Sequence, residues 1–573
     1  FSRKKFDDGF PNMAIDWCLQ EAGIRPEQID SVAFYDKPIL KFDRLLDNYL
    51  TVAPRGLYSF LDIIPRWLHK RLWIKDDIKK HLKGFRGEII FPEHHMSHAA
   101  HAFYTSPFKE CAILTIDGVG EWTTTSFGTA QNNSIKLTDD IRWPHSVGLF
   151  YSAFTYFLGF KVNEGEYKLM GLAAYGEPKY ANLILDKLLD LKEDGSFRLN
   201  MRYFNYPQGL TMTNEAFDKL FGGVRRESEG IVAKRYMDIA ASIQKVIEEV
   251  ILRIVRHLFR ETGVENLCLA GGVALNCVSN SRILKEGPFK RLWIQPASGD
   301  AGGALGVALL IHHKTLGHGR AVLPGDSMRG SLLGPSYSEE EIEKYLNSVG
   351  AQYKKMSPKK LVRRTAELIA NGKVVGWFQG RMEFGPRALG SRSILGDPRS
   401  KGIRFVMNEI KCRETFRPFA PSVLKEYVSD YFKLDSDSPY MLLVASVQEY
   451  RRVQISGWQR SLSGIEEHNI ALSDIPAVTH VDYSARVQSV DDKRNPRLHR
   501  IMTKFKEKTD CSVIINTSFN VRGEPIVLTP EDAYRCFMFT HMDVLVLENH
   551  VLYKEEQEKL EGADEHLADF ELD

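Results

Sequence analysis

The stretch NLCLAGGVALN, residues 266–276, decides the fold of the first part of this chain. Its first five residues form an apolar run typical of a buried strand, and the two glycines end that strand before a helix through Asn280. Upstream, residues 233–262 place apolar side chains at helical spacing and predict a long amphipathic helix. Downstream, a strand at 291–295 opens into SGDAGG, residues 298–303, and then an apolar helix. This alternation of helix, strand and glycine turn predicts an α/β layered domain.

Another strand and turn lie earlier in the chain. Residues 111–116 are apolar, and DGVG at 117–120 separates them from 122–129, which we expect to be the hairpin partner. A glycine-rich turn with an acid at its head suits a phosphate or a metal–phosphate complex, although plain hairpin turns share the same pattern.

The second half of the chain predicts a second set of elements. RGSLLGPSYSEEE, residues 329–341, is rich in Gly, Ser and Pro and indicates a domain boundary. Beyond it we expect a helix at 359–371 and strands at 373–378, 441–447, 477–481, 512–515 and 542–547. The last segment, 554–573, is acidic, which is typical of a frayed tail.

Bulk properties narrow the class of protein. A chain of 573 residues is expected to form two or more domains. Its 76 basic and 74 acidic residues leave a net charge of +2, so we expect no nucleic-acid and no membrane partner bound through bulk charge. Seven dispersed cysteines, no leader-like apolar segment and no apolar run near the roughly 20 residues that span a bilayer predict a cytoplasmic protein.

Four histidines occur within HHMSHAAH, residues 94–101. In a helix His94 and His98 share one face, a spacing that suits two ligands of one metal, whereas His95 points away. The best carboxylate partners are Asp117 and Asp300, which each follow a predicted strand and precede a glycine or small residue. Such a mixed N/O set fits Fe²⁺, Mn²⁺ or Zn²⁺ better than Ca²⁺. The alternatives are a histidine-rich surface helix and aspartates that serve as helix N-caps.

Two further patterns suit anionic ligands. Backbone N–H groups at the turn Gly271-Gly272 could hold a nucleotide phosphate, although tight packing of strand against helix explains these glycines equally well. In the second half, cations are interleaved with Phe, Gly and Pro in 379–392, 411–419 and 516–523. That interleaving favours a lined pocket for a polyanion such as ATP over a solvated charged face.

Seven motifs occur in one order along the chain: HHMSHAA at 94–100, TIDGVGE at 115–121, GEYKLMGL at 165–172, GGVALN at 271–276, GPRALG at 385–390, FRPFAP at 416–421 and NTSFN at 516–520. With them, the chain from Phe1 to about Tyr553 resembles the O-carbamoyltransferases that act on nodulation factors, cephalosporins and aminoglycosides.

The resemblance implies a fold class of α/β and α+β. It implies an actin/sugar-kinase-like carbamoyl-transfer domain at 1–335, a YrdC-like domain at 336–553 and the acidic tail at 554–573. The family opens with a strand and hairpin that carry a His-Asp pair near the acceptor site. We expect that first hairpin to be missing here. Its absence would affect transfer of the carbamoyl group to the acceptor but not formation of the adenylate.

The resemblance also implies a reaction. Carbamoyl phosphate and ATP give carbamoyl-adenylate in the C-terminal domain, and a divalent metal, Fe²⁺ in the family, assists transfer to a hydroxyl of a small molecule in the N-terminal domain. Mg²⁺ could accompany the ATP, and the family suggests a homodimer. The implied metal ligands are His94, His98, Asp117 and Asp300. The implied catalytic residues are Lys411, Arg413, Arg417, Arg486, Ser518 and Asn520. The residues assigned to cofactor binding are Gly118, Lys168, Gly271, Gly272, Val273, Asn276 and Arg387.

Two other functions remain open at this point. A fused tRNA threonylcarbamoyl transferase would share these motifs, but the near-neutral charge argues against a tRNA substrate. An actin- or chaperone-like nucleotide-binding module would explain the first domain, but it would leave the histidine cluster and the second cationic pocket without a purpose.

Overall fold

The computed structural model describes residues 1–5, 7–323, 325–455 and 470–558. These residues form two compact units. One holds nearly all described residues up to Ser327, and the other begins at Met328 and also takes in Arg3–Lys5 and Ala174–Gly176. Across the described residues, no helix combines the length and the apolar character needed to cross a membrane.

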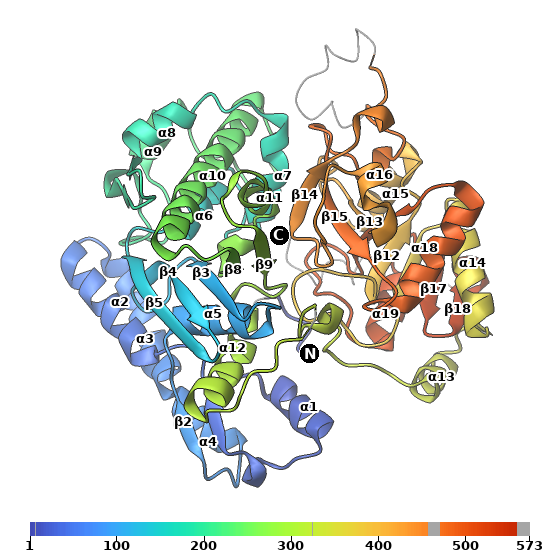
Figure 1. Ribbon diagram of the computed structural model, residues 1–573, viewed down its shortest axis with the longest axis horizontal. Coiled ribbons are helices and arrows are strands. Elements are labelled where there is room, and N and C mark those ends of the chain that lie inside the picture. The colour runs from blue at the N-terminus through green and yellow to red at the C-terminus, as the bar shows by residue number, and fades with distance from the viewer. Residues whose placement is uncertain (6, 324, 456–469, 559–573) are drawn as a thin grey trace. The chain divides into compact units, whose positions relative to one another are not determined.

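The core of the first unit is a five-stranded sheet with the order β5-β4-β3-β8-β9 (Figure 1). β3 (Glu110–Ile116), β4 (Thr123–Gln131) and β5 (Ser134–Arg142) are antiparallel neighbours, which confirms the predicted hairpin. β8 (Asn266–Ala270) and β9 (Arg291–Ile294) continue the sheet in parallel with β3. Because β3 lies in the middle, every residue of it after Glu110 is buried.

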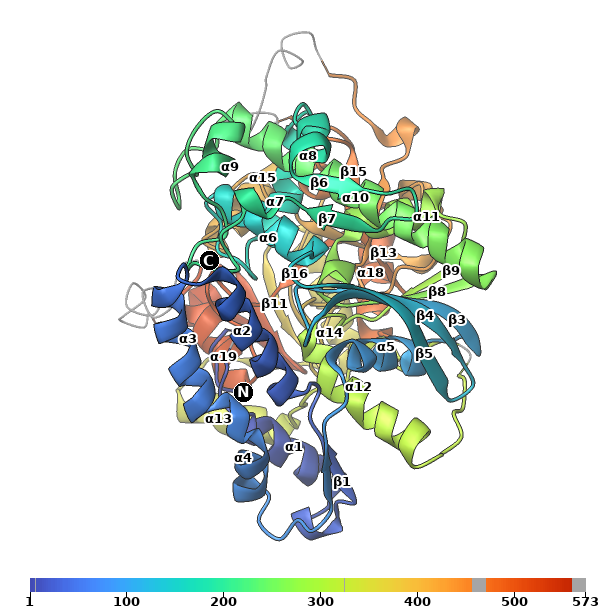
Figure 2. The same cartoon turned by 90° about the vertical axis from the view of Figure 1, so that its left-hand side faces the viewer.

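Helices cover both faces of this sheet (Figure 2). α10 (Lys234–Thr262) packs on one face, as its amphipathic pattern predicted, and it ends at Gly263 in the left-handed conformation. α5 (His94–Thr105) and α12 (Gly303–Leu310) pack against each other, and α5 contacts β3 and β8. α5 is therefore fixed beside the ends of the two central strands.

The glycine turn after β8 differs from the prediction. Residues Gly272–Leu275 form a 3₁₀ turn, and the helix α11 spans Cys277–Glu286 instead of ending near Asn280. The physical reason is that the Asn276 side chain accepts from the Ser279 N–H and so caps a helix that begins after it. Gly271 has φ +90°, and a Cβ there would lie 2.1 Å from the Ile116 carbonyl oxygen, so the close approach of the β8 end to β3 requires glycine.

The remaining elements of the first unit surround this core. β1 (Ser31–Ala33) and β2 (Glu88–Ile90) form a parallel pair, and β6 (Leu189–Leu191) and β7 (Phe197–Leu199) form an antiparallel pair. The other helices are α1 (Asn12–Ala22), α2 (Pro38–Val52), α3 (Leu57–His69), α4 (Ile74–His81), α6 (Val147–Phe157), α7 (Glu166–Leu172), α8 (Ala181–Lys187) and α9 (Glu215–Leu220).

The second unit is built on a mixed nine-stranded sheet with the order β10-β18-β17-β11-β12-β16-β13-β15-β14. Its strands are β10 (Lys354–Lys355), β11 (Val375–Phe378), β12 (Arg392–Gly396), β13 (Ala420–Leu424), β14 (Leu443–Ser446), β15 (Ser484–Val490), β16 (Val513–Ser518), β17 (Val544–Leu547) and β18 (His550–Tyr553). In the residues that the structure describes, its helices are α13 (Glu339–Ser348), α14 (Pro358–Ala370), α15 (Lys401–Ile410), α16 (Val428–Tyr431), α18 (Pro496–Thr509) and α19 (Pro530–Met538). The α/β class expected for the chain is confirmed.

The second unit differs from the sequence-based expectations in two places. The strand predicted at 477–481 is wrong, because Pro476–Val478 form a 3₁₀ turn, and the strand in this region is β15, which pairs with both β13 and β14. The first residues of the predicted tail are held, since Gln557 exchanges hydrogen bonds with the Gln352 backbone at 3.1 and 2.8 Å. The rest of the tail, 559–573, lies outside the described residues.

Candidate functional site

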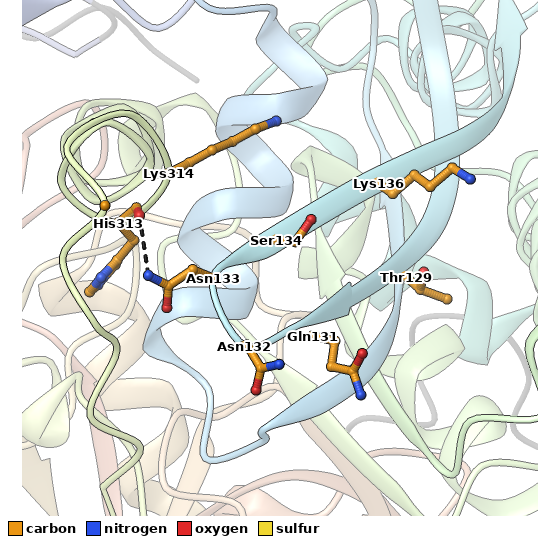
Figure 3. A pocket seen from close by; sticks show the side chains of 9 residues that line it. Thr129, Gln131, Asn132, Asn133, Ser134, Lys136, His313 and Lys314 are labelled. Atoms are coloured by element: carbon orange, nitrogen blue, oxygen red, sulfur yellow. Dashed lines mark hydrogen bonds between the residues drawn. The ribbon is translucent and has the colours of Figure 1, made fainter.

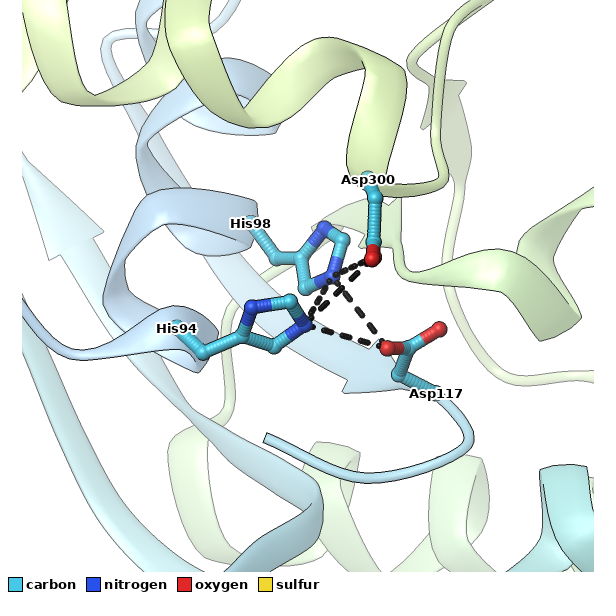
Figure 4. Close-up of side chains that lie close together, drawn as sticks. All are labelled: His94, His98, Asp117 and Asp300. Atoms are coloured by element: carbon cyan, nitrogen blue, oxygen red, sulfur yellow. Dashed lines mark hydrogen bonds and ion pairs between the residues drawn. The ribbon is translucent and has the colours of Figure 1, made fainter. Parts of the chain in front are cut away.

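Four side chains in the first unit converge on one point (Figure 4). His94 and His98 lie one turn apart on α5, and their Nε2 atoms are 3.1 Å apart. The Nε2 atom of His94 lies 3.1 Å from Asp117 Oδ2 and 3.5 Å from Asp300 Oδ1, and His98 Nε2 lies 3.6 Å from each of these oxygens. The four ligand atoms all lie within 4.8 Å of one another.

The two carboxylates are brought there by the sheet. Asp117 directly follows β3, and its Oδ1 accepts from the Gly272 N–H at 2.8 Å, so the turn after the neighbouring strand β8 aims its Oδ2 at the histidines. Asp300 begins the 3₁₀ turn Asp300–Gly302 that leads into α12. Asp117 is largely buried, whereas the Asp300 side chain is 57% exposed, so the cluster opens on the side of Asp300.

The cluster is electrostatically coupled. Burial alone would raise the pKa of Asp117, but hydrogen bonds to His94 and His98 outweigh it and hold that pKa well below the ordinary value. Burial alone would lower the pKa of His98, but hydrogen bonds to Asp117 and Asp300 raise it. The two carboxylates therefore stabilise positive charge between the rings, whether a proton or a cation supplies it.

The other two histidines of α5 support the pair. His101 Nε2 lies 3.0 Å from His98 Nδ1, and His95 Nδ1 lies 2.7 Å from the Thr115 hydroxyl. Burial, followed by the neighbouring His98 or His94, lowers the pKa of both supporting rings, which favours their neutral forms. All four histidines are buried, so the alternative of a histidine-rich surface helix is wrong. A neutral His101 that holds the far nitrogen of His98 is the arrangement that orients a metal ligand.

The residues present fit a divalent metal. Two imidazole nitrogens and two carboxylates are a donor set suited to Fe²⁺, Mn²⁺ or Zn²⁺. Without a cation, the cluster would bring two buried imidazole nitrogens to within 3.1 Å of each other. The fit supports the predicted ligands, and their role stays a prediction.

A second cluster surrounds Lys411 in the second unit. Lys411 directly follows α15 and is 5% exposed. Its Nζ donates to the Ser518 carbonyl at 2.6 Å, the Ser518 hydroxyl at 3.0 Å and the Asn520 carbonyl at 2.8 Å. Burial, and then the charge of Arg413, lowers the pKa of Lys411 well below its ordinary value. The structure thus brings together three of the predicted catalytic residues.

Several arginines lie near Lys411. Burial, and then repulsion from Arg417, lowers the pKa of Arg413 well below its ordinary value, with smaller contributions of the same sign from Arg486 and Arg404. Arg413 Nε donates to Asn408 Oδ1 at 2.7 Å, and its guanidinium lies 4.2 Å from the centre of the Phe419 ring. Glu414, 3.6 Å from Arg417, works in the opposite direction but does not outweigh burial and the other arginines, and the remaining positive charge suits a polyanion.

Comparison with known families identifies the chain. Residues 1–309 match the family model described as carbamoyltransferase N-terminus, and residues 366–554 match the one described as carbamoyltransferase C-terminus. The chain belongs to the carbamoyltransferase family. Both clusters lie within the matched residues of this carbamoyltransferase.

Several known proteins are similar to this carbamoyltransferase. The uncharacterized protein sll1178 of Synechocystis sp. is 57% identical over 100% of this chain and 95% of that protein. Nodulation protein NolNO of Sinorhizobium fredii is 34% identical over 96% of this chain and 76% of that protein. The 3'-hydroxymethylcephem-O-carbamoyltransferase of Streptomyces clavuligerus is 30% identical over 64% of this chain and 61% of that protein. The solved structure of T. kodakarensis HypF has 16% identity and a TM-score of 0.21 over 42% of this chain and 38% of that one, too low a likeness to compare folds.

The residues that the sequence assigned to cofactor binding in the first unit have structural partners in the carbamoyltransferase. The Gly272 N–H is committed to Asp117, and the Gly118 carbonyl accepts from the Ser146 hydroxyl at 2.7 Å. Lys168 lies on α7 and is 1% exposed. Gly271 and Val273 belong to the turn after β8, and Asn276 caps α11. The Gly272 amide is therefore not available to a phosphate in this conformation, and the nucleotide role of the turn stays a prediction.

Two of the arginines in 379–392 lie in different surroundings. Arg392 is fully buried, donates to the carbonyls of Gln379, Ser391, Pro335 and Gly380 at 3.1 to 3.2 Å and stacks on Phe378. The hydrogen bonds of its guanidinium thus go to backbone carbonyls and not to a ligand pocket. Arg387 lies in the loop before β12, which Glu383 shapes by accepting from the Leu389 and Ser391 N–H groups at 2.7 Å.

Glu121 is a positioning residue that sequence reasoning missed. Both of its carboxylate oxygens accept from the His94 N–H at 3.1 Å, and Oε1 also accepts from the Lys37 N–H at 2.8 Å. A buried carboxylate at the first residue of α5 accepts from an N–H group that has no partner within the helix. Its negative charge also interacts favourably with the positive end of the helix dipole. The contact could not be read from local sequence, because His94 lies 27 residues before Glu121. The one available signal was the place of Glu121 in the turn DGVGE.

A hollow of about 610 Å³ lies elsewhere on the first unit (Figure 3). It is formed by the turn between β4 and β5 and by the segment after α12, where Asn133 Nδ2 donates to the His313 carbonyl at 3.2 Å. Its polar lining includes Gln131, Lys136 and Lys314. The site residues predicted from the sequence do not line it.

Proposed function

We propose that this carbamoyltransferase forms carbamoyl-adenylate from ATP and carbamoyl phosphate at the Lys411 cluster and transfers the carbamoyl group to a hydroxyl of a small molecule at the His94 cluster. The observation that carries the proposal is the gathering of Arg413 and further arginines beside the buried Lys411, in a chain whose two parts match carbamoyltransferase models.

The first reaction involves only polyanions. Water attacks carbamoyl phosphate and the bond between the carbamoyl group and phosphate breaks, which gives carbamate and inorganic phosphate. A carbamate oxygen then attacks the α-phosphorus of ATP while the bond to the β-phosphate breaks and pyrophosphate leaves. Lys411 is held by Ser518 and Asn520, so its charge occupies a fixed point and needs no reorganisation when negative charge develops. Arg413, Arg417 and Arg486 would neutralise the phosphates and the departing pyrophosphate.

The second reaction suits the cluster in the first unit. The acceptor hydroxyl oxygen attacks the carbamoyl carbon and gives up its proton to solvent, the bond to the adenylate oxygen breaks, and AMP leaves. His94, His98, Asp117 and Asp300 would hold a divalent metal, which supplies a Lewis acid for the carbamoyl oxygen. His101 fixes the orientation of His98, and the Gly272 N–H fixes that of Asp117. The name of the cephem relative, an O-carbamoyltransferase, supports a hydroxyl as the acceptor, which we extend to this chain as part of the proposal.

Pyrophosphate release tests the activation step. The wild type, Lys411→Ala and the control Lys433→Ala are assayed with ATP in the presence and absence of carbamoyl phosphate. Lys433 is an exposed lysine of the same unit that pairs with Glu449 at 2.6 Å. We expect release to require carbamoyl phosphate, to fall by roughly 100-fold or more in Lys411→Ala and to persist in the control. Release from folded protein that does not depend on carbamoyl phosphate would contradict the proposal.

A further inference from the structure

Arg3, the third residue of the sequence, makes largely buried ion pairs within the second unit. Its NH2 group lies 2.8 Å from Glu524 Oε1, and its Nε lies 3.1 Å from Asp532 Oδ1. The same guanidinium donates to the carbonyls of Pro525 and Ile526 at 3.1 and 2.6 Å. The Arg3 side chain is 19% exposed and that of Glu524 is fully buried, so these contacts are screened little by solvent.

The two carboxylates shape the loop that joins β16 to α19. Glu524 Oε2 accepts from the Val521 N–H at 3.1 Å, and the Glu524 carbonyl accepts from Asn520 Nδ2 at 2.6 Å. Asp532 Oδ2 accepts from the N–H groups of Leu528 and Thr529 at 3.1 Å, at the start of α19. Arg3 therefore lies between the carboxylates that fix the two ends of this loop.

The loop in turn carries the partners of Lys411. Asn520 is held by Glu524 through its amide nitrogen, and it presents its carbonyl oxygens to the Lys411 ammonium and to the Ser518 hydroxyl. Removing Arg3 would leave a fully buried carboxylate without its counter-charge, an arrangement that proteins avoid by protonation or by rearrangement of the backbone. Either response changes the contacts that Glu524 makes with Val521 and Asn520.

We infer that Arg3 is a positioning residue of the Lys411 site, and that its guanidinium holds the β16–α19 loop in the shape that brings Ser518 and Asn520 onto the lysine. The inference adds Arg3, which lies 521 positions before Glu524 in the sequence, to the residues that support the proposed reaction. Its effect on catalysis rests on the proposed function, whereas its effect on the lysine does not.

The first experiment measures the lysine directly. Full-length wild type, Arg3→Ala, Arg3→Lys and the control Arg66→Ala are treated with a small amine-acylating reagent, and the labelling rate at Lys411 is followed by mass spectrometry relative to exposed Lys433. Arg66 is an exposed arginine that pairs with Asp62 on α3. We expect Lys411 to be labelled at least about fivefold faster in Arg3→Ala, with Arg3→Lys between it and the wild type, because a lysine keeps the charge but not the fork. Equal labelling of Lys411 in wild type and Arg3→Ala would overturn the inference even if the proposed function fails.

The second experiment measures turnover on the same proteins. We expect kcat/KM for carbamoyl-phosphate-dependent pyrophosphate release to fall about tenfold or more in Arg3→Ala, to be partly retained in Arg3→Lys, and to recover on addition of guanidinium, which does not rescue Lys411→Ala. Thermal unfolding is recorded in parallel. A lower melting temperature with wild-type kcat/KM would show that Arg3 only stabilises the fold, and it would overturn the inference. If Arg3→Ala does not fold, the same test is made on Arg3→Lys: wild-type kcat/KM that does not respond to guanidinium would overturn the inference. No carbamoyl-phosphate-dependent release by the wild type would instead contradict the proposed function alone.

Discussion

Replacing Gly271 by alanine is expected to disrupt the joint between the two central strands of the first unit. The added Cβ would lie 2.1 Å from the Ile116 carbonyl oxygen and 2.6 Å from its carbon, and these are backbone atoms that no side-chain rotation can move away. The φ of +90° with ψ of 163° lies in a region that only glycine adopts readily. Backbone strain costs about 1–3 kcal/mol and overpacking about 1–3 kcal/mol. Together they are expected to lower the free energy of unfolding by about 4 kcal/mol.

Gly263→Ala is the matched control. Gly263 also has a positive φ, +62°, but a Cβ there would meet nothing within 4 Å, so we expect a loss of only about 1 kcal/mol. Amide hydrogen exchange in peptides that span β8 reports the difference, because about 3 kcal/mol corresponds to roughly 100-fold faster exchange. Equal exchange rates in the two variants would refute the claim that the Ile116 contact, and not the positive φ alone, requires glycine. Ile116 is followed by Asp117, so Gly271→Ala should also weaken divalent-metal binding, whereas Gly263→Ala should not.

Three other substitutions test the His94 cluster and the structural role of Arg392. Asp117→Asn should lower the affinity for Fe²⁺, Mn²⁺ or Zn²⁺ by more than about 100-fold in calorimetric titration, and an unchanged affinity would exclude Asp117 as a ligand. Glu121→Gln keeps the size of the side chain but not its charge, and it should lower that affinity by about 10-fold through the start of α5; an unchanged value would show that Glu121 does not position His94. Arg392→Met should destabilise the second unit by about 3 kcal/mol or more in denaturant unfolding, because buried carbonyls lose their donors. We expect KM for ATP to change little. A large rise in KM with normal stability would place Arg392 in the ligand pocket instead.

Local patterns predicted those elements whose signals are local. The 3.6-residue periodicity of 233–262 corresponds to α10, and the apolar run at 266–270 corresponds to β8. The strand β15 was missed because its sequence, SARVQSV, mixes polar and apolar residues, while the apolar run beside it belongs to a turn that starts at Pro476. Gln488 and Ser489 of β15 are polar but buried, and Gln488 is satisfied by hydrogen bonds to Ser422 and Asn516. Tertiary context therefore overrode the hydrophobicity signal.

The candidate sites show the same limit. The spacing of His94 and His98 predicts one helix face, and strand ends suggested Asp117 and Asp300, so the geometry of this set was largely accessible from the sequence. In contrast, composition cannot tell an arginine that faces a ligand from one that, like Arg392, is used by backbone carbonyls. Arg3 has no local signal at all, because its carboxylate partners lie more than 500 residues away.

The order of the four metal-binding candidates along the chain has a consequence for biosynthesis. The two histidines leave the ribosome first and Asp117 follows soon after, but the set is complete only when Asp300 has been made, after β8 and β9. A nascent chain halted before that point would offer three ligands on an unfinished sheet and would hold a cation more weakly. Metal capture would then be a late event in synthesis, one that marks chains in which the central strands have already assembled.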